Sequence, residues 1–106
     1  MSDYEVMVLG PVEKYAWEEF RFSLDFAPWI GSDPISVQEV KMYDASDVDQ
    51  SVTMVGTVDH VGTVVRAIWK AGTIGTTYYA RYRVTTTAAK KLEARVQVNV
   101  VDKKTV

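Results

Sequence analysis

The chain has no cysteine among its 106 residues, and this absence excludes several kinds of chemistry. Disulfide bonds, thiolate nucleophiles and cysteine-based zinc sites all require that residue. A protein of this composition must therefore be held together by packing and hydrogen bonds. We expect it to need no cofactor and no metal ion.

Long apolar runs and an excess of positive charge are also missing. No stretch approaches the roughly 18 consecutive apolar residues that a membrane-spanning helix requires, so we expect no membrane partner. Residues 1–9 contain Asp3 and Glu5 and lack the basic start and apolar centre of a secretory signal, which predicts folding in a cytoplasm. The formal net charge of −2 disfavours a general affinity for nucleic acid, because such affinity comes mostly from neutralising phosphates.

The chain does contain a two-residue period of apolar side chains, most clearly in residues 20–26, 78–84 and 92–100. Successive side chains of a strand point to opposite faces of a sheet, so this period predicts strands with one buried and one exposed face. About seven such strands, separated by turn residues, predict an all-β protein. The expected architecture is an immunoglobulin-like, antiparallel Greek-key β-sandwich.

We expect one domain over residues 1–106, with a frayed tail at about 102–106. The first strand should end at Gly10-Pro11, because proline lacks an amide donor. Residues 12–17 should form a helical turn or a loop, and residues 59–62 a tight turn. The predicted strands span residues 4–9, 18–26, 35–43, 51–58, 63–69, 76–87 and 91–100.

Five residues are predicted to have structural roles. Trp29 follows a proline and precedes a turn, so we expect it to plug the open end of the core. Trp69 belongs to the inward-facing set of its strand. Gly72 and Gly75 supply a permissive backbone for the next link. Tyr78 then lies where an immunoglobulin-type fold has a tyrosine corner.

Five other residues form the predicted protein interface. Val64 and Ile68 occupy the second phase of their strand, which indicates either a central strand or one whose outer face meets a partner. Tyr79, Arg81 and Arg83 share an outward face, while Tyr78 and Tyr82 point inward. Exposed arginine and tyrosine favour a protein interface over a nucleic-acid platform. Val6 or Val8, near the first edge, is a further candidate.

No pattern of catalytic residues is found. His60 follows Asp59 and suggests an acid-base pair, but no nucleophile in a suitable context accompanies it, so a solvated turn histidine is expected. Asp44, Asp47 and Asp49 offer oxygen ligands for calcium, but their spacing does not match an EF-hand loop. We therefore expect no enzyme and no small-molecule substrate, and we interpret residues 44–50 as a solvated acidic loop.

Two segments carry a resemblance to a known family. Residues 22–31, followed by Ile35, resemble the Asp-Phe-x-x-Trp-Leu segment of small bacteriophage and prophage proteins described as fibre-tail adaptors. Residues 69–78 and 83–86 are similar to the Gly-Gly-Thr-x-Gly-Thr-x-Tyr and Arg-Val-Thr-Thr blocks of that family. The chain departs from the pattern at Ala71, where a glycine is usual, and at residues 89–91, which replace a Gly-Arg hairpin.

The resemblance implies a one-domain immunoglobulin-like protein encoded among virion structural genes, with no catalytic residues to transfer. The expected role is a small adaptor or decoration domain that folds in the bacterial host cytoplasm and then enters the virion. Its partners would be other virion proteins or further copies of itself. The alternative is a carbohydrate or host-surface binding module on the same scaffold, and burial of Trp17, Trp29 and Trp69 would count against it.

Overall fold

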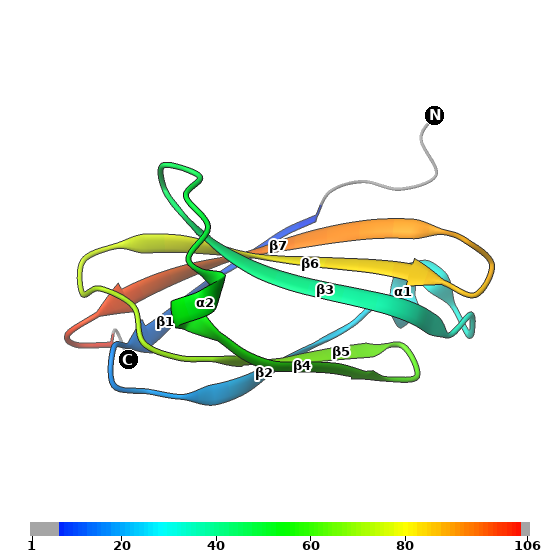
Figure 1. Cartoon of the computed structure of the whole chain (residues 1–106), viewed down its shortest axis with the longest axis horizontal. Helices are drawn as coiled ribbons and strands as arrows, with labels where there is room; N and C mark the ends of the chain where they lie inside the picture. The colour runs from blue at the N-terminus through cyan, green and yellow to red at the C-terminus, as the bar shows by residue number, and fades with distance from the viewer. Residues whose placement is uncertain (1–6, 105–106) are drawn as a thin grey trace.

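A computed structural model describes residues 7–104 of the protein, with side chains from Leu9 onward, and shows two packed β-sheets (Figure 1). The four-stranded sheet has the order β1-β7-β6-β3 and the three-stranded sheet the order β2-β5-β4. The strands are β1 (Met7–Tyr15), β2 (Phe20–Asp25), β3 (Ile35–Asp44), β4 (Val55–Val61), β5 (Val64–Trp69), β6 (Thr77–Thr86) and β7 (Lys91–Val101). The predicted all-β sandwich is confirmed.

The sheets are not purely antiparallel, because β1 pairs in parallel with β7. The other strand pairs, β2 with β5, β3 with β6, β4 with β5 and β6 with β7, are antiparallel as expected. With the strands lettered A to G, the sheets are A-G-F-C and B-E-D. This order differs from the constant-type ABED and CFG sheets only in where the first strand pairs. The immunoglobulin-like Greek-key assignment stays a prediction.

The predicted end of β1 at Gly10-Pro11 is wrong. The strand continues to Tyr15, and its pairing with β7 shifts between Leu9 and Val12. Gly10 has a φ of +98°, and the Gly10-Pro11 peptide bond is cis. An irregularity on an edge strand accommodates a residue without an amide hydrogen, so the strand resumes pairing at Val12 instead of forming a turn.

Trp29 does not plug the core. It lies in a one-turn helix, α1 (Ala27–Ile30), and is 45% exposed. Phe26 and Ile30 close that end instead, and both are buried. Residues four apart share one side of a helical turn, so these two face inward while Trp29 points away and touches the Phe26 ring edge-on at 6.2 Å.

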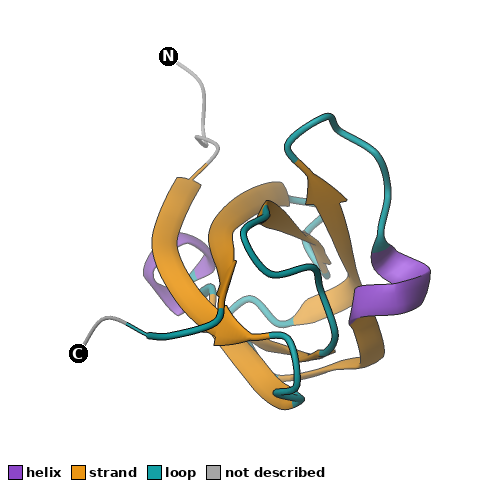
Figure 2. Ribbon diagram, turned by 90° about the vertical axis from the view of Figure 1, so that its left-hand side faces the viewer, coloured by secondary structure: helices purple, strands orange, loops and turns teal. Residues whose placement is uncertain are grey.

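The strand predicted over residues 51–58 is instead a one-turn helix, α2 (Ser51–Met54), followed by β4. The Asp49 carboxylate accepts a hydrogen bond from the Ser51 amide, and the Gln50 carbonyl accepts one from the Met54 amide. The helical turn buries Met54. The pairing of β4 shifts between Val55 and Val58, around Gly56. Figure 2 shows the two short helices on opposite flanks of the strands.

The core is organised around Trp69, which is fully buried. Its ring stacks on Phe22 at 4.2 Å, and its Nε1–H donates to the Tyr82 hydroxyl at 2.9 Å. That hydroxyl in turn donates to the Phe22 carbonyl at 3.2 Å. Burial raises the pKa of Tyr82, so its hydroxyl stays protonated and available as a donor. These bonds satisfy polar groups between the sheets.

The link between β5 and β6 is fixed by Tyr78. Its hydroxyl accepts a hydrogen bond of 3.0 Å from the Thr73 backbone amide, which is the bond that a tyrosine corner makes. The Gly75 amide donates to the Val100 carbonyl at 2.8 Å. Ala71 and Ala89, which stand at the two departures from the adaptor pattern, both have positive φ, +56° and +66°. Glycine adopts such a backbone more readily, which explains its use there in the family pattern.

None of the helices in the described part of the chain is long and apolar enough to cross a membrane.

Candidate interaction surfaces

The five predicted interface residues lie on opposite faces of the sandwich. Tyr79, Arg81 and Arg83 are on the outer face of the four-stranded sheet, because the alternate residues of β6 are buried. Val64 and Ile68 are on the outer face of the three-stranded sheet, because Val65, Ala67 and Trp69 point into the core. The five residues therefore make two separate surfaces.

The outer face of the four-stranded sheet contains three rows that cross β3, β6 and β7 in register. We call these nine positions the arginine face. One row is aromatic and polar, one is wholly cationic and one alternates in charge. They are Tyr43-Tyr79-Gln97, Lys41-Arg81-Arg95 and Glu39-Arg83-Glu93.

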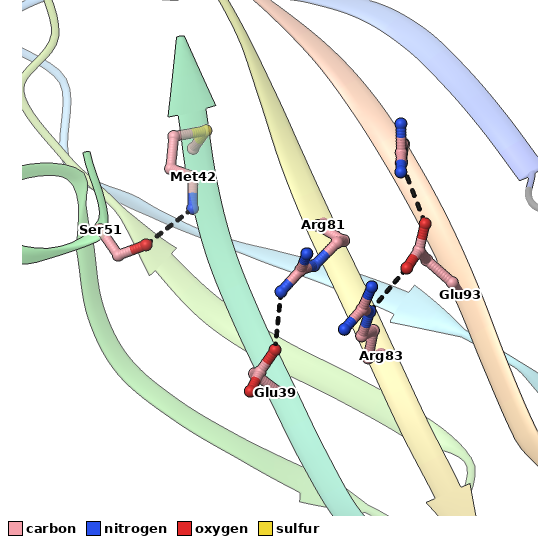
Figure 3. A network of polar contacts seen from close by, with 7 residues as sticks. Glu39, Met42, Ser51, Arg81, Arg83 and Glu93 are labelled. Atoms are coloured by element: carbon pink, nitrogen blue, oxygen red, sulfur yellow. Dashed lines mark hydrogen bonds and ion pairs between the residues drawn. The ribbon is translucent and has the colours of Figure 1, made fainter. Parts of the chain in front are cut away.

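Ion pairs within and between the rows fix the arginine side chains (Figure 3). Arg81 Nη2 donates to Glu39 at 3.0 Å, and the guanidinium carbon lies 4.9 Å from the centre of the Tyr43 ring. Glu93 accepts two bonds, one from Arg83 Nε at 2.6 Å and one from Arg95 Nε at 3.0 Å. The guanidiniums are thus held in position, since charge-assisted bonds of this kind are short and directional.

Glu93 is the buried centre of this network, with its residue 8% exposed. Burial opposes ionisation of the carboxyl, but the hydrogen bonds and charges of Arg83 and Arg95 outweigh it and lower the pKa of Glu93. An acid whose pKa is lower in the folded state stabilises the fold above its unfolded pKa. That contribution is lost as the pH falls through the folded value.

We expect Glu93→Gln to lower the free energy of unfolding by about 1 kcal/mol at neutral pH, because two arginines lose a charged acceptor. The difference from the unmodified protein should shrink as the pH falls below the ordinary pKa of glutamic acid. Urea unfolding across an acidic pH series measures it. Glu19→Gln, at an exposed position, is the matched control and should change little. A pH-independent deficit for Glu93→Gln would contradict this account.

The outer face of the three-stranded sheet is less apolar than the sequence suggests. Val64 and Ile68 are separated by Arg66, whose guanidinium makes two bonds of 2.7 Å to the Asp59 carboxylate. β5 is the central strand of its sheet, which accounts for its apolar residues in both phases. Val6 lies outside the described residues, as does the side chain of Val8.

The structure does not bring the suspected acid-base pair together. His60 lies in β4 and not in a turn, and its Nδ1 is 2.5 Å from the Gln38 Oε1. Asp59 instead pairs with Arg66. The prediction of a turn at residues 59–62 was wrong because β4 continues to Val61, which pairs with Val64.

The acidic loop uses its carboxylates internally. Asp44 Oδ1 accepts hydrogen bonds from the amides of Ser46 and Val48, at 2.9 and 3.0 Å. Within residues 7–104 there is no group of three or more histidine, cysteine or acidic side chains that could hold a metal ion. The predicted solvated loop is therefore a self-bonded turn. Hydrogen bonds from Val48 and Ser46 lower the pKa of Asp44, and hydrogen bonds from Ser51 lower the pKa of Asp49.

Trp17 is an exposed residue that the sequence analysis did not place in an interface. It is 93% exposed and lies in the turn between β1 and β2. The Tyr15 amide donates to the Glu18 carboxylate at 2.7 Å, and Lys104 pairs with the same carboxylate at 2.7 Å. The tail predicted to be frayed is thus held at Lys104, while residues 105–106 lie outside the description.

Comparison with known families matches the chain to one model. The model described as "Podophage GP4 fiber-tail adaptor protein gp77" matches residues 14–99. This chain belongs to that family. No curated protein matches it. The match confirms the resemblance to fibre-tail adaptors and covers the arginine face as well as Trp17. Membership in an adaptor family supports a structural role in the phage particle.

Proposed function

We propose that the protein is a non-enzymatic adaptor or decoration domain that makes protein contacts in the tail or fibre region of a virion. The family match over residues 14–99 is the observation that carries this proposal. The protein folds in the bacterial host cytoplasm and joins the particle there. Its partners are other virion proteins or further copies of the same chain, without nucleic acid, membrane or small-molecule substrates.

The two outer faces of the sandwich support such a role. An adaptor must touch two bodies, and Arg81 and Val64 lie on faces that point in opposite directions. Arginine and tyrosine are enriched where proteins bind one another. The ion pairs of the arginine face hold its side chains before a partner arrives, which reduces the entropy lost on binding.

The test is incorporation of face variants into particles made in the host. We expect the double substitution of Arg81 and Arg83 by glutamate, and separately of Val64 and Ile68 by aspartate, to reduce the amount of protein in purified particles at least about tenfold. Val52→Asp, at an exposed position of α2 away from both faces, is a matched surface control. Circular dichroism verifies that each variant folds. Unchanged incorporation of the Val64 and Ile68 variant would remove that face from the proposal.

A carbohydrate or host-surface binding module remains the second candidate, because Trp17 favours it. Burial of all three tryptophans would have counted against sugar stacking, but only Trp69 is buried. Trp17 offers an exposed ring on a turn fixed by Glu18 and Lys104. A glycan array that gives signals with the protein, and loses them with Trp17→Ala, would favour this candidate.

A further inference from the structure

The cationic row Lys41-Arg81-Arg95 is an unusual feature of the arginine face. Lys41 lies directly opposite Arg81 in the pairing of β3 with β6. Arg81 lies directly opposite Arg95 in the pairing of β6 with β7. Like charges placed directly opposite on neighbouring strands destabilise a sheet. The fold by itself therefore gains nothing from this row.

The neighbouring carboxylates compensate only part of this charge. Glu39 and Glu93 are shared among Arg81, Arg83 and Arg95. Within the part of the chain whose side chains are described, Lys41 makes no ion pair. The arginine face thus holds four cations and two carboxylates, whereas the whole chain has a net charge of −2. Positive charge is concentrated here in a protein that is otherwise acidic.

An open hollow lies beside the row. It is lined by Tyr43, Asp47, Tyr79, Arg81 and Arg95. The Arg95 and Arg83 side chains are each half exposed and use Nε for Glu93, so their Nη groups can donate to an acceptor on another molecule. Free guanidinium N–H groups in a fixed plane suit a carboxylate, which accepts two parallel bonds. Asp47 borders the hollow and offsets one positive charge.

The charges of this row already lower the pKa of one carboxyl in the chain's own acidic loop. The pKa of Asp49 is lowered first by hydrogen bonds from Ser51 and then by the charges of Lys41 and Arg81. Carboxylates near the row are therefore favoured in their ionised form. The same attraction acts on carboxylates that approach from another molecule.

We propose that the row Lys41-Arg81-Arg95, together with Tyr43 and Tyr79, binds an acidic peptide segment of a protein partner in the particle. This inference rests on the proposed adaptor function. Two strand spacings separate Lys41 from Arg95, a distance of about 10 Å. An extended segment places alternate side chains roughly 7 Å apart. The long lysine, arginine and glutamate side chains make up the difference, so two carboxylates separated by one residue engage the row together. The Tyr43 and Tyr79 rings border the hollow and pack against the segment between those carboxylates.

An acidic peptide fits this surface better than a nucleic acid does. Glu39, Glu93 and Asp47 interrupt the cations and repel a continuous phosphate backbone. A peptide with spaced carboxylates avoids them. The experiment must therefore also measure binding of a nucleic acid, because tighter binding of that ligand would contradict the proposal.

The probe is a synthetic peptide in which glutamate alternates with glycine, titrated into the isotope-labelled full chain at low ionic strength. We expect saturable binding, with the largest resonance shifts at the Nε–H groups of Arg81 and Arg95. Lys41→Gln and Arg95→Gln should each weaken binding about threefold to fivefold. Arg21→Gln, on the outer face of the other sheet, is the matched control and should leave the affinity unchanged. The corresponding glutamine peptide should not bind.

Equal weakening by Arg21→Gln would overturn the proposal, as would tighter binding of a single-stranded oligonucleotide than of the peptide under the same conditions. Particle assays separate this inference from the proposed function. If removal of the protein leaves particles unchanged, the adaptor function is wrong. If its removal abolishes particles but the Lys41→Gln, Arg95→Gln double variant is incorporated normally, only the proposed binding surface is wrong.

Discussion

Trp69→Ala is expected to lower the free energy of unfolding by about 3–5 kcal/mol, a large fraction of the stability of a small domain. The ring is fully buried and contacts Phe20, Phe22 and Tyr82. Its removal leaves a cavity between the two sheets and takes away a hydrogen bond of the Tyr82 hydroxyl. Both losses act on the folded state, because an unfolded chain exposes the ring and its N–H to water.

Urea unfolding followed by circular dichroism measures this effect, and two variants make the result specific. Trp69→Phe keeps most of the ring and should lose less, because a smaller cavity remains. Trp17→Ala removes a ring that is 93% exposed and should change the stability by less than about 0.5 kcal/mol. Similar losses for Trp17→Ala and Trp69→Ala would show that the assignment of buried and exposed tryptophans is wrong.

Gly72→Ala is the second substitution with a large expected effect, a loss of about 2–4 kcal/mol. Gly72 has a φ of +105°, where an L-residue with a side chain is strained. An added Cβ would also lie 2.8 Å from Val100 Cγ2 and 3.1 Å from Met54 Cε. Backbone strain and overpacking therefore add at one position.

Gly75→Ala separates these two causes. Gly75 has a φ of +86°, but an added Cβ would meet nothing within 4 Å, so this variant reports backbone strain alone. We expect it to lose about 1–2 kcal/mol, less than Gly72→Ala. In a double-mutant cycle, Gly72→Ala should cost less stability in a Val100→Ala background, because the smaller side chain relieves the overpacking. Equal losses for the two glycine variants, with no coupling to Val100, would rule out the packing contribution.

Much of the fold follows from local alternation. The strands at residues 20–25, 35–44, 64–69, 77–86 and 91–101 lie close to their predicted bounds. Inward positions such as Tyr78, Tyr82 and Val96 are buried as their phase requires. The prediction works here because side-chain period is a property of the strand itself and does not depend on which strand lies beside it.

The errors occur where short-range signals compete with distant contacts. Gly10-Pro11 predicts a stop, but pairing with β7 carries β1 past it. Residues 51–54 have strand-forming side chains, yet the Asp49 carboxylate and the Gln50 carbonyl hold them in a helical turn. Trp29 has a large apolar ring, but Phe26 and Ile30 already occupy the inward side of α1. Residue type alone does not decide which of several apolar groups is buried.

The candidate surfaces show the same division. The sequence predicts Tyr79, Arg81 and Arg83 on one outward face, because they alternate along one strand. Nothing in the sequence placed Lys41 and Arg95 beside Arg81, since the three residues come from strands far apart in the chain. Nor could it separate Val64 and Ile68 from the arginines, because a period of two assigns inside or outside but not which sheet.

The amino-acid sequence thus specified strands, their buried sides and the family, since these depend on neighbouring residues along the chain. Strand pairing and register were decided by tertiary structure. They brought Lys41, Arg81 and Arg95 into one row, joined the first and last strands in parallel and left Trp17 exposed. The physical reason is that these features arise from contacts between segments whose separation in the chain leaves no local pattern.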